Sequence, residues 1–253
     1  MLISVAQFQL FFLALTRIMA ILVTMPFLGG STVPNSVKVS LGFILTITLI
    51  PWQPLSAESP VMGLFPFGLA ILQELIIGLV AGFAVSLTFA VFQMVGKLME
   101  LGAGFSAGQI FNPTLGEMAS SYDQLFMMVV FVYFFTINGH HMFLIGLEKT
   151  FQVLPVHSGL GNLAAERVIT LFQTMIVSAF QLALPVMGAI LLADLTLGLL
   201  ARVAPQIQVF FLGLPVKVWL GIVALGISFS AILPLAGKVF LQMSQRMQYL
   251  LGA

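Results

Sequence analysis

Long stretches without a charged residue constrain this chain more than any other feature. Five such stretches are each about as long as the roughly 20 residues that an α-helix needs to cross the hydrocarbon core of a membrane. They cover residues 18–37, 75–96, 124–147, 168–193 and 218–237. Only 7% of all residues are charged, whereas a soluble domain carries roughly a quarter charged residues. The sequence therefore predicts an all-α, multi-helix integral membrane protein.

Prolines, glycines and the few charges divide the chain into apolar blocks, each of which predicts a helix. The blocks cover residues 5–28, 37–51, 65–101, 124–147, 168–201 and 216–241. Two of them, 65–101 and 168–201, would extend about 50 Å as straight helices, compared with a hydrocarbon core of about 30 Å. We therefore expect these two to tilt, kink or project from the membrane, with Pro185 as the kink in the second. The first block is expected to be an uncleaved helix, because Arg17 interrupts it and no basic segment precedes it.

The charge and the absence of cysteine exclude several kinds of site. The net charge is +1, which gives no electrostatic footprint for nucleic acid. The chain has no cysteine, so it forms no disulfide and offers no thiolate to a metal ion or a substrate. We therefore expect membrane lipids, and not nucleic acid, to surround the chain.

Three charged residues lie inside the apolar blocks: Arg17, Glu74 and Asp194. Each would cost roughly 2.5–3.5 kcal/mol at the centre of a bilayer, so each needs a partner. Two explanations stay open. The charges form a proton or ion relay, or they form salt bridges inside the helix bundle or with another subunit. The second is favoured, because no second carboxylate lies one helical turn away to share a proton.

The segment INGHHMF contains two adjacent histidines, His140 and His141. Neighbouring side chains on a helix point about 100° apart, so these two cannot chelate one ion as residues four positions apart can. Asn138 and Gly139 precede them, which favours residues at the interfacial end of a helix. We therefore predict no metal ion, no cofactor and no catalytic residue.

Small residues recur at four-residue spacing at Gly78, Gly82 and Ser86. They share one helix face, which lets a second helix approach closely in a membrane. The pattern indicates close packing and does not identify the helix that packs there.

The stretch GAGFSAGQIFNP at 102–113 has three glycines and no charge. It is not a phosphate-binding loop, because that loop requires a terminal Gly-Lys-Ser/Thr or a preceding strand. Gly104 and Gly108 are compatible with a helix-packing seam, but Asn112 and Pro113 end any helix. Irregular backbone at membrane depth is tolerated only where protein buries it or where it lines a cavity. A pore segment and a connector outside the membrane are therefore both open.

The stretch ARVAPQIQVFFLGLPVKV at 201–218 differs from an ordinary turn between two long helices. It combines a basic residue, two prolines and two glutamines with four consecutive bulky apolar residues at 209–212. An apolar patch of this kind indicates a contact with another protein or burial in an interface.

Taken together, these segments resemble the FliR (SctT) family of inner-membrane subunits of the flagellar and type III secretion export gate. The segment TRIMAILVTMPFLGGSTVPNSVKVSLGFILTITLIP is similar to the amino-terminal pattern of the family, GFSAGQIFNP to its mid-chain loop and NGHH to its following helix end. The most specific match is DLTLGLLARVAPQIQVFFLGLPVKVWLG at 194–221. The resemblance extends over nearly the whole chain.

The resemblance implies a non-enzymatic subunit that assembles with FliP-like, FliQ-like and FlhB-like subunits in the bacterial inner membrane, in the flagellar basal body. Unfolded export substrates would pass through this assembly. The implied organisation is one export-gate subunit over 1–253, with a FliP-like part over about 1–160 and a FliQ-like helical hairpin over about 161–253.

The resemblance also implies roles for individual residues. A plug or gate loop would comprise Gly104, Phe105, Gly108, Gln109, Ile110, Phe111, Asn112 and Pro113. A loop at the cytoplasmic entrance would comprise Arg202, Pro205, Gln206, Phe210, Phe211, Pro215 and Lys217. Arg17, Glu74 and Asp194 would be buried polar contacts between subunits.

Two other classes of function compete with this reading. A secondary transporter of a small solute would use Arg17, Glu74 and Asp194 as its binding site, and would carry a matching broken helix in each half of the chain. No such pairing is visible in the sequence. An intramembrane enzyme would need converging catalytic groups, which His140 and His141 alone do not provide.

Overall fold

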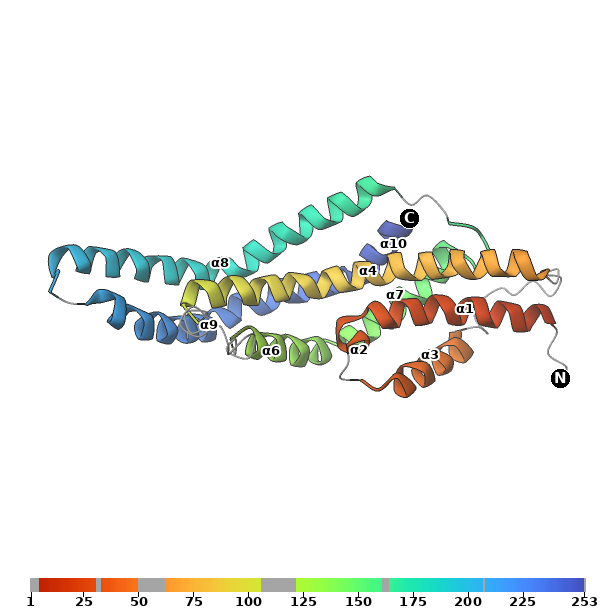
Figure 1. Cartoon of the computed structure of the whole chain (residues 1–253), viewed down its shortest axis with the longest axis horizontal. Coiled ribbons are helices and arrows are strands. Elements are labelled where there is room, and N and C mark those ends of the chain that lie inside the picture. The colour runs from red at the N-terminus through yellow and green to blue at the C-terminus, as the bar shows by residue number, and fades with distance from the viewer. Residues whose placement is uncertain are drawn as a thin grey trace. The chain divides into compact units, whose positions relative to one another are not determined.

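The computed structural model describes residues 5–30, 33–49, 62–105, 122–160, 164–206 and 208–252. All regular secondary structure within these ranges is α-helical, and no strand occurs there (Figure 1). The predicted all-α fold is therefore confirmed.

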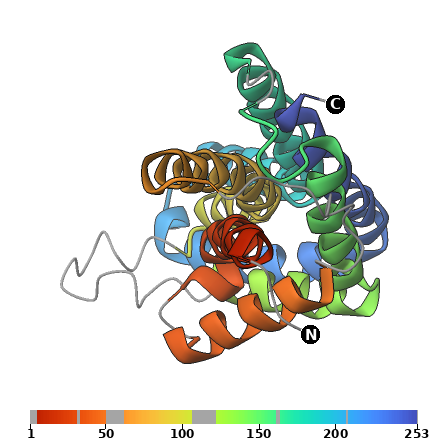
Figure 2. The same ribbon diagram turned by 90° about the vertical axis from the view of Figure 1, so that its right-hand side faces the viewer.

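The first three helices belong to the amino-terminal part of the chain. They are α1 (Val5–Thr24), α2 (Pro26–Gly29) and α3 (Asn35–Leu49). Helix α1 ends just before Pro26, because a residue that precedes proline is disfavoured in helical conformation. Lys38 Nζ then donates hydrogen bonds to the carbonyl oxygens of Gly29 and Gly30, at 3.2 and 2.8 Å, and so caps α2. This short connection places α3 beside α1, as Figure 2 shows.

Three helices are longer than one membrane crossing requires. They are α4 (Leu64–Ala103), α8 (Ala165–Val203) and α9 (Val209–Leu241), with 40, 39 and 33 residues. The predicted excess length of the 65–101 and 168–201 blocks is thus confirmed. Helix α8 continues through Pro185 and α9 through Pro215 and Pro234. Each of these prolines removes one backbone hydrogen bond without ending the helix.

The block predicted as one helix over 124–147 is two helices, α6 (Tyr122–Thr136) and α7 (Gly139–Val153). The prediction of a continuous helix was wrong because Asn138 adopts a left-handed backbone conformation with φ 57°. Asparagine tolerates this region better than most residues do. The last helix, α10 (Met243–Leu251), ends at Gly252, which is also left-handed with φ 106°. Glycine is the usual residue at such a helix end.

Helix length and composition identify the candidate membrane spans. The described residues include four helical segments that are long and apolar enough to cross a membrane: 5–24, 64–103, 165–203 and 211–251. The broken pair α6 and α7 would make a fifth if it counts as one span. Helix α3 is apolar but shorter.

The chain forms two compact units. Unit 1 comprises Met1–Phe89, His140–Gln173 and Leu241–Ala253, and unit 2 comprises Ala90–Gly139 and Thr174–Phe240. Each unit is built from separate segments because α4 and α8 each run from one unit into the other, and the boundaries near Gly139 and Leu241 fall at helix ends. The interior of unit 2 includes the stacked rings of Phe92 and Phe240, whose centroids are 4.6 Å apart. The predicted division near residue 160 separates a FliP-like part from a FliQ-like hairpin, and it is a statement of similarity to two other subunit families. The two compact units do not test that similarity, so the division stays a prediction.

Candidate functional site

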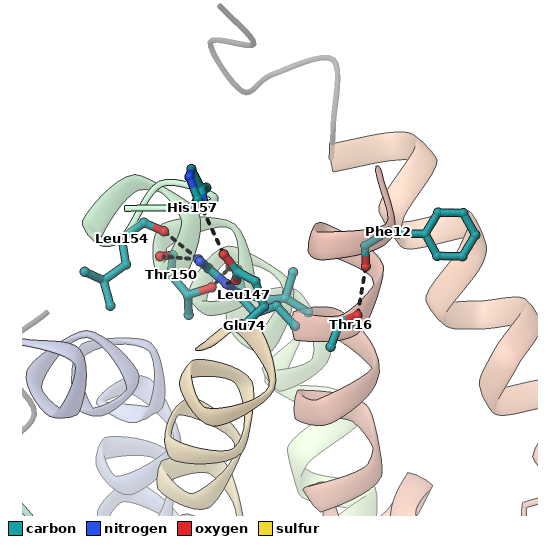
Figure 3. A network of polar contacts seen from close by, with 8 residues as sticks. Phe12, Thr16, Glu74, Leu147, Thr150, Leu154 and His157 are labelled. Carbon is teal, nitrogen blue, oxygen red and sulfur yellow. Dashed lines mark hydrogen bonds and ion pairs between the residues drawn. The ribbon is translucent and has the colours of Figure 1, made fainter. Parts of the chain in front are cut away.

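Arg17 is the most completely buried charged residue among the described helices, with a side chain that is 0% exposed. It lies on α1, and its Nε donates to Glu74 Oε2 on α4 at 2.5 Å. Its Nη1 donates to the carbonyl oxygens of Thr150 and Leu154 at the end of α7, at 3.1 and 2.6 Å. Figure 3 shows these contacts, which lie entirely within unit 1.

Glu74 completes this cluster with its second carboxylate oxygen. Glu74 Oε1 accepts a hydrogen bond from the backbone N–H of His157 at 3.0 Å (Figure 3). His157 has a positive φ of 68°, which is uncommon for a residue other than glycine. The carboxylate therefore fixes the backbone that follows α7, in addition to neutralising Arg17.

Two further features suit Arg17 to this position. Its guanidinium carbon lies 4.5 Å from the centroid of the Phe151 ring, close enough for a cation–π interaction. The last carbonyls of a helix lack intrahelical donors and carry partial negative charge, so a guanidinium is a suitable group to cap them. Arg17 and Glu74 thus join α1, α4 and the end of α7. We name the residues that take part in these hydrogen bonds the Arg17 cluster: Arg17, Glu74, Thr150, Leu154 and His157.

Glycines allow α4 to approach α1 closely beside this cluster. A Cβ atom added to Gly78 would lie 2.6 Å from both the carbonyl oxygen of Arg17 and the Cβ of Ala20. A Cβ added to Gly82 would lie 1.8 Å from Thr24 Oγ1. The predicted close-packing face of Gly78 and Gly82 is confirmed, and its partner is α1.

The first two residues of the predicted plug loop lie in unit 2. Gly104, with φ 77°, and Phe105 follow the end of α4. The ring centroids of Phe105 and Tyr122 are 4.9 Å apart. Gly108 to Pro113, which complete the predicted loop, lie outside the described residues.

An ion pair that the sequence analysis did not predict joins α4 and α6. Lys97 Nζ lies 2.8 Å from Asp123 Oδ2 and 3.8 Å from Glu100 Oε2. The available signal was the opposite charge of Lys97 and Asp123 on the two sides of residues 101–122, a stretch in which Glu117 is the one charged residue.

The predicted entrance loop is shorter than expected. Only residues 204–208 lie between α8 and α9, so Phe210, Phe211, Pro215 and Lys217 belong to helix α9. The predicted loop over these residues was wrong because Pro215 does not end the helix that contains it. Arg202 lies in the last turn of α8, and Pro205 and Gln206 form the turn that follows.

Asp194 pairs with Lys217 and not with Arg17. Asp194 Oδ1 on α8 contacts Lys217 Nζ on α9, and within the chain the aspartate side chain is 40% exposed. The pair borders a pocket of about 360 Å³ that Gly198, Ala201 and Leu214 also line. The three charges of the alternative transporter site therefore form two separate ion pairs. Their predicted role as contacts between subunits stays a prediction.

His140 and His141 lie at the start of α7, with ring centroids 5.0 Å apart. In the part of the chain that the structure describes, no three histidine, aspartate or glutamate side chains are grouped to hold a metal ion.

Comparison with known proteins relates these features to a family. The sequence pattern described as bacterial export proteins, family 1, matches residues 8–243. The chain is 28% identical over 251 residues to the flagellar biosynthetic protein FliR of Bacillus subtilis, covering 97% of this chain and 95% of that one. It is 30% identical over 233 residues to FliR of Escherichia coli, covering 92% and 88%.

A protein from a different kind of system is also similar. The surface presentation of antigens protein SpaR of Shigella sonnei is 28% identical over 213 residues, covering 82% of this chain and 80% of that one. The match to the family pattern extends from α1 to the start of α10 and includes every residue of the Arg17 cluster. The chain therefore belongs to the family of bacterial export proteins, family 1.

Proposed function

We propose that this chain is a channel-forming subunit of the bacterial flagellar type III protein export gate. In this role it passes unfolded flagellar proteins across the inner membrane at the flagellar basal body. The observation that carries the proposal is the similarity over nearly the full chain to proteins named flagellar biosynthetic protein FliR. The long apolar helices support a place in a membrane.

The proposed partners are FliP-like and FliQ-like subunits, with an FlhB-like subunit at the cytoplasmic face. Exposed leucine, phenylalanine and tryptophan side chains on α8 and α9 support extensive contact with lipid or other apolar helices. They include Leu191, Leu195, Leu199, Phe211 and Trp219. The Asp194–Lys217 pair beside them favours protein over lipid for part of this surface, because charged groups avoid hydrocarbon.

Copurification tests this function. A tagged chain extracted in mild detergent from cells that express the neighbouring export genes should bring down FliP-like and FliQ-like proteins. The control is the same tagged chain in cells from which those genes are deleted. A chain recovered alone, with solute-coupled transport in vesicles, would instead support the secondary transporter.

The second part of the proposal concerns the segment 104–113, which we propose closes the pore as a plug. Phe105, Ile110 and Phe111 supply apolar bulk, and Gly104 and Gly108 supply backbone freedom. The left-handed conformation of Gly104 at the end of α4 supports a chain that turns away from the helix at this point.

Deletion of residues 104–110 tests the plug. Cells that contain the assembled gate should then leak ions or small solutes, because the apolar obstruction is removed while the helices remain. The leak is measured as the rate of potassium loss or dye entry, normalised to the amount of gate recovered by copurification. Unchanged permeability with normal assembly would contradict the plug.

A further inference from the structure

Three helices of unit 2 meet at Gly221. This residue lies on α9, and a Cβ atom added to it would be 2.6 Å from the Cβ of Ala103, the last residue of α4. The hydroxyl of Tyr122, the first residue of α6, donates a hydrogen bond to the carbonyl oxygen of Gly221 at 3.2 Å. One residue of α9 therefore contacts both the residue that ends α4 and the residue that begins α6.

The closeness of this contact is specific to Gly221. Real Cβ atoms essentially never come within 3.0 Å of another heavy atom, so only glycine fits here while Ala103 keeps its methyl group. By contrast, a Cβ added to Gly226, on the same helix, would meet nothing within 4 Å. Glycine costs a helix about 1 kcal/mol relative to alanine, and at Gly221 the close approach of α4 accounts for it.

The groups around this contact are buried and paired. Ala103 is 0% exposed and Tyr122 is 4% exposed. The Tyr122 ring contacts Phe105, and its neighbour Asp123 forms the ion pair with Lys97 on α4. About two helical turns before Gly221, Leu214 lies 3.4 Å from the position of a Cβ on Gly104. We name the central contact of Ala103, Tyr122 and Gly221 the plug-base contact.

From this geometry we infer that Gly221 is a positioning residue for the plug. It holds together the two chain ends, Ala103 and Tyr122, between which the proposed plug lies. Helix α9 begins at Val209 and carries Lys217 four residues before Gly221. A movement of α9 that separates it from Ala103 and Tyr122 would thus act on described residues on both sides of the proposed plug in the chain. This inference rests on the proposed function of 104–113 as a plug.

Substitution of Gly221 by alanine tests the inference in the assembled gate. The new methyl group would overlap that of Ala103 and force α9 away from α4. We expect the rate of ion leak per assembled gate to rise about tenfold or more, the change that about 1.4 kcal/mol produces in an open–closed equilibrium. The matched control G226A adds the same methyl group in open space and should leave the leak unchanged.

A second substitution distinguishes the contact from a general disturbance of α9. In the double variant G221A with A103G, the methyl group has moved from α4 to α9 and the overlap is gone. The leak should return close to that of the unchanged gate. A leak in G221A that A103G does not reduce would overturn the inference, because it would arise elsewhere on α9.

Tyr122→Phe covers the case in which G221A fails to assemble. This variant keeps the ring against Phe105 and removes only the hydroxyl that binds the Gly221 carbonyl. An increased leak with normal copurification of partners supports the positioning role. The positioning role is overturned if Y122F shows no increase in leak and G221A either shows no increase in leak or does not assemble. The 104–110 deletion is measured in parallel: if it leaks while these variants stay closed, the plug stands and only the role of Gly221 falls.

Discussion

Arg17 offers more hydrogen-bond donors than its one carboxylate partner accepts, and its Nη1 group binds backbone carbonyls instead. A guanidinium carries five N–H donors in a fixed plane. In the Arg17 cluster, Nε binds Glu74 and Nη1 binds Thr150 and Leu154, whereas Nη2 has no hydrogen-bond partner among the residues that the structure describes. The sequence could predict that a cation in an apolar block needs a partner. It could not predict the carbonyls of α7, because every residue supplies the same carbonyl group.

Removal of Arg17 should therefore destabilise the protein strongly. We expect Arg17→Met to lower the free energy of unfolding in detergent by about 3–5 kcal/mol, because Glu74 is left buried without its counter-charge. The double variant R17M/E74M should recover part of this loss, since no unpaired charge remains. Denaturant titration followed by circular dichroism measures both values. Arg202→Gln, at an exposed arginine, serves as control and should change the free energy little; an R17M chain as stable as this control would contradict the role of the cluster.

At the scale of elements, glycine positions decide which helices approach closely. The four-residue spacing of Gly78 and Gly82 was visible in the sequence, and the structure confirms that this face packs closely. The partner helix could not be predicted, because α1 at the contact presents ordinary residues such as Ala20 and Thr24. Gly221 was missed for a related reason. A single glycine in an apolar helix has no periodicity, and its importance comes only from Ala103 on another helix.

The seam between α1 and α4 gives a prediction at this scale. Gly78→Ala should destabilise the protein by about 1–3 kcal/mol, the usual cost of overpacking, because the backbone carbonyl of Arg17 cannot rotate away from the new methyl group. Gly68→Ala adds the same group to the same helix with nothing within 4 Å, and should be neutral or stabilising by up to about 1 kcal/mol. The midpoint of thermal unfolding in detergent should therefore fall for Gly78→Ala and stay unchanged or rise for Gly68→Ala. Equal midpoints for the two variants would refute close packing at Gly78.

For the molecule as a whole, the kind of elements followed from the sequence, whereas their number and their breaks followed only in part. Charge-free length predicted the all-α fold and the long helices α4 and α8. It failed at Asn138, where one left-handed residue divides a continuous apolar block, and at Pro215, which stays within α9. In both cases the outcome depends on the surrounding packing and not on the residue type alone. The division of the chain into two compact units was likewise hidden, because α4 and α8 each take part in both.

The Arg17 cluster also sets an order of events during synthesis. Arg17 enters the membrane within the first helix, but Glu74 follows 57 residues later, and the carbonyls of Thr150 and Leu154 follow 133 and 137 residues later. Until then α1 carries a cation that costs roughly 2.5–3.5 kcal/mol at the bilayer centre. We therefore expect the nascent α1 to stay near the membrane surface or beside the insertion machinery until α4 arrives, and to reach its final depth only when α7 is complete.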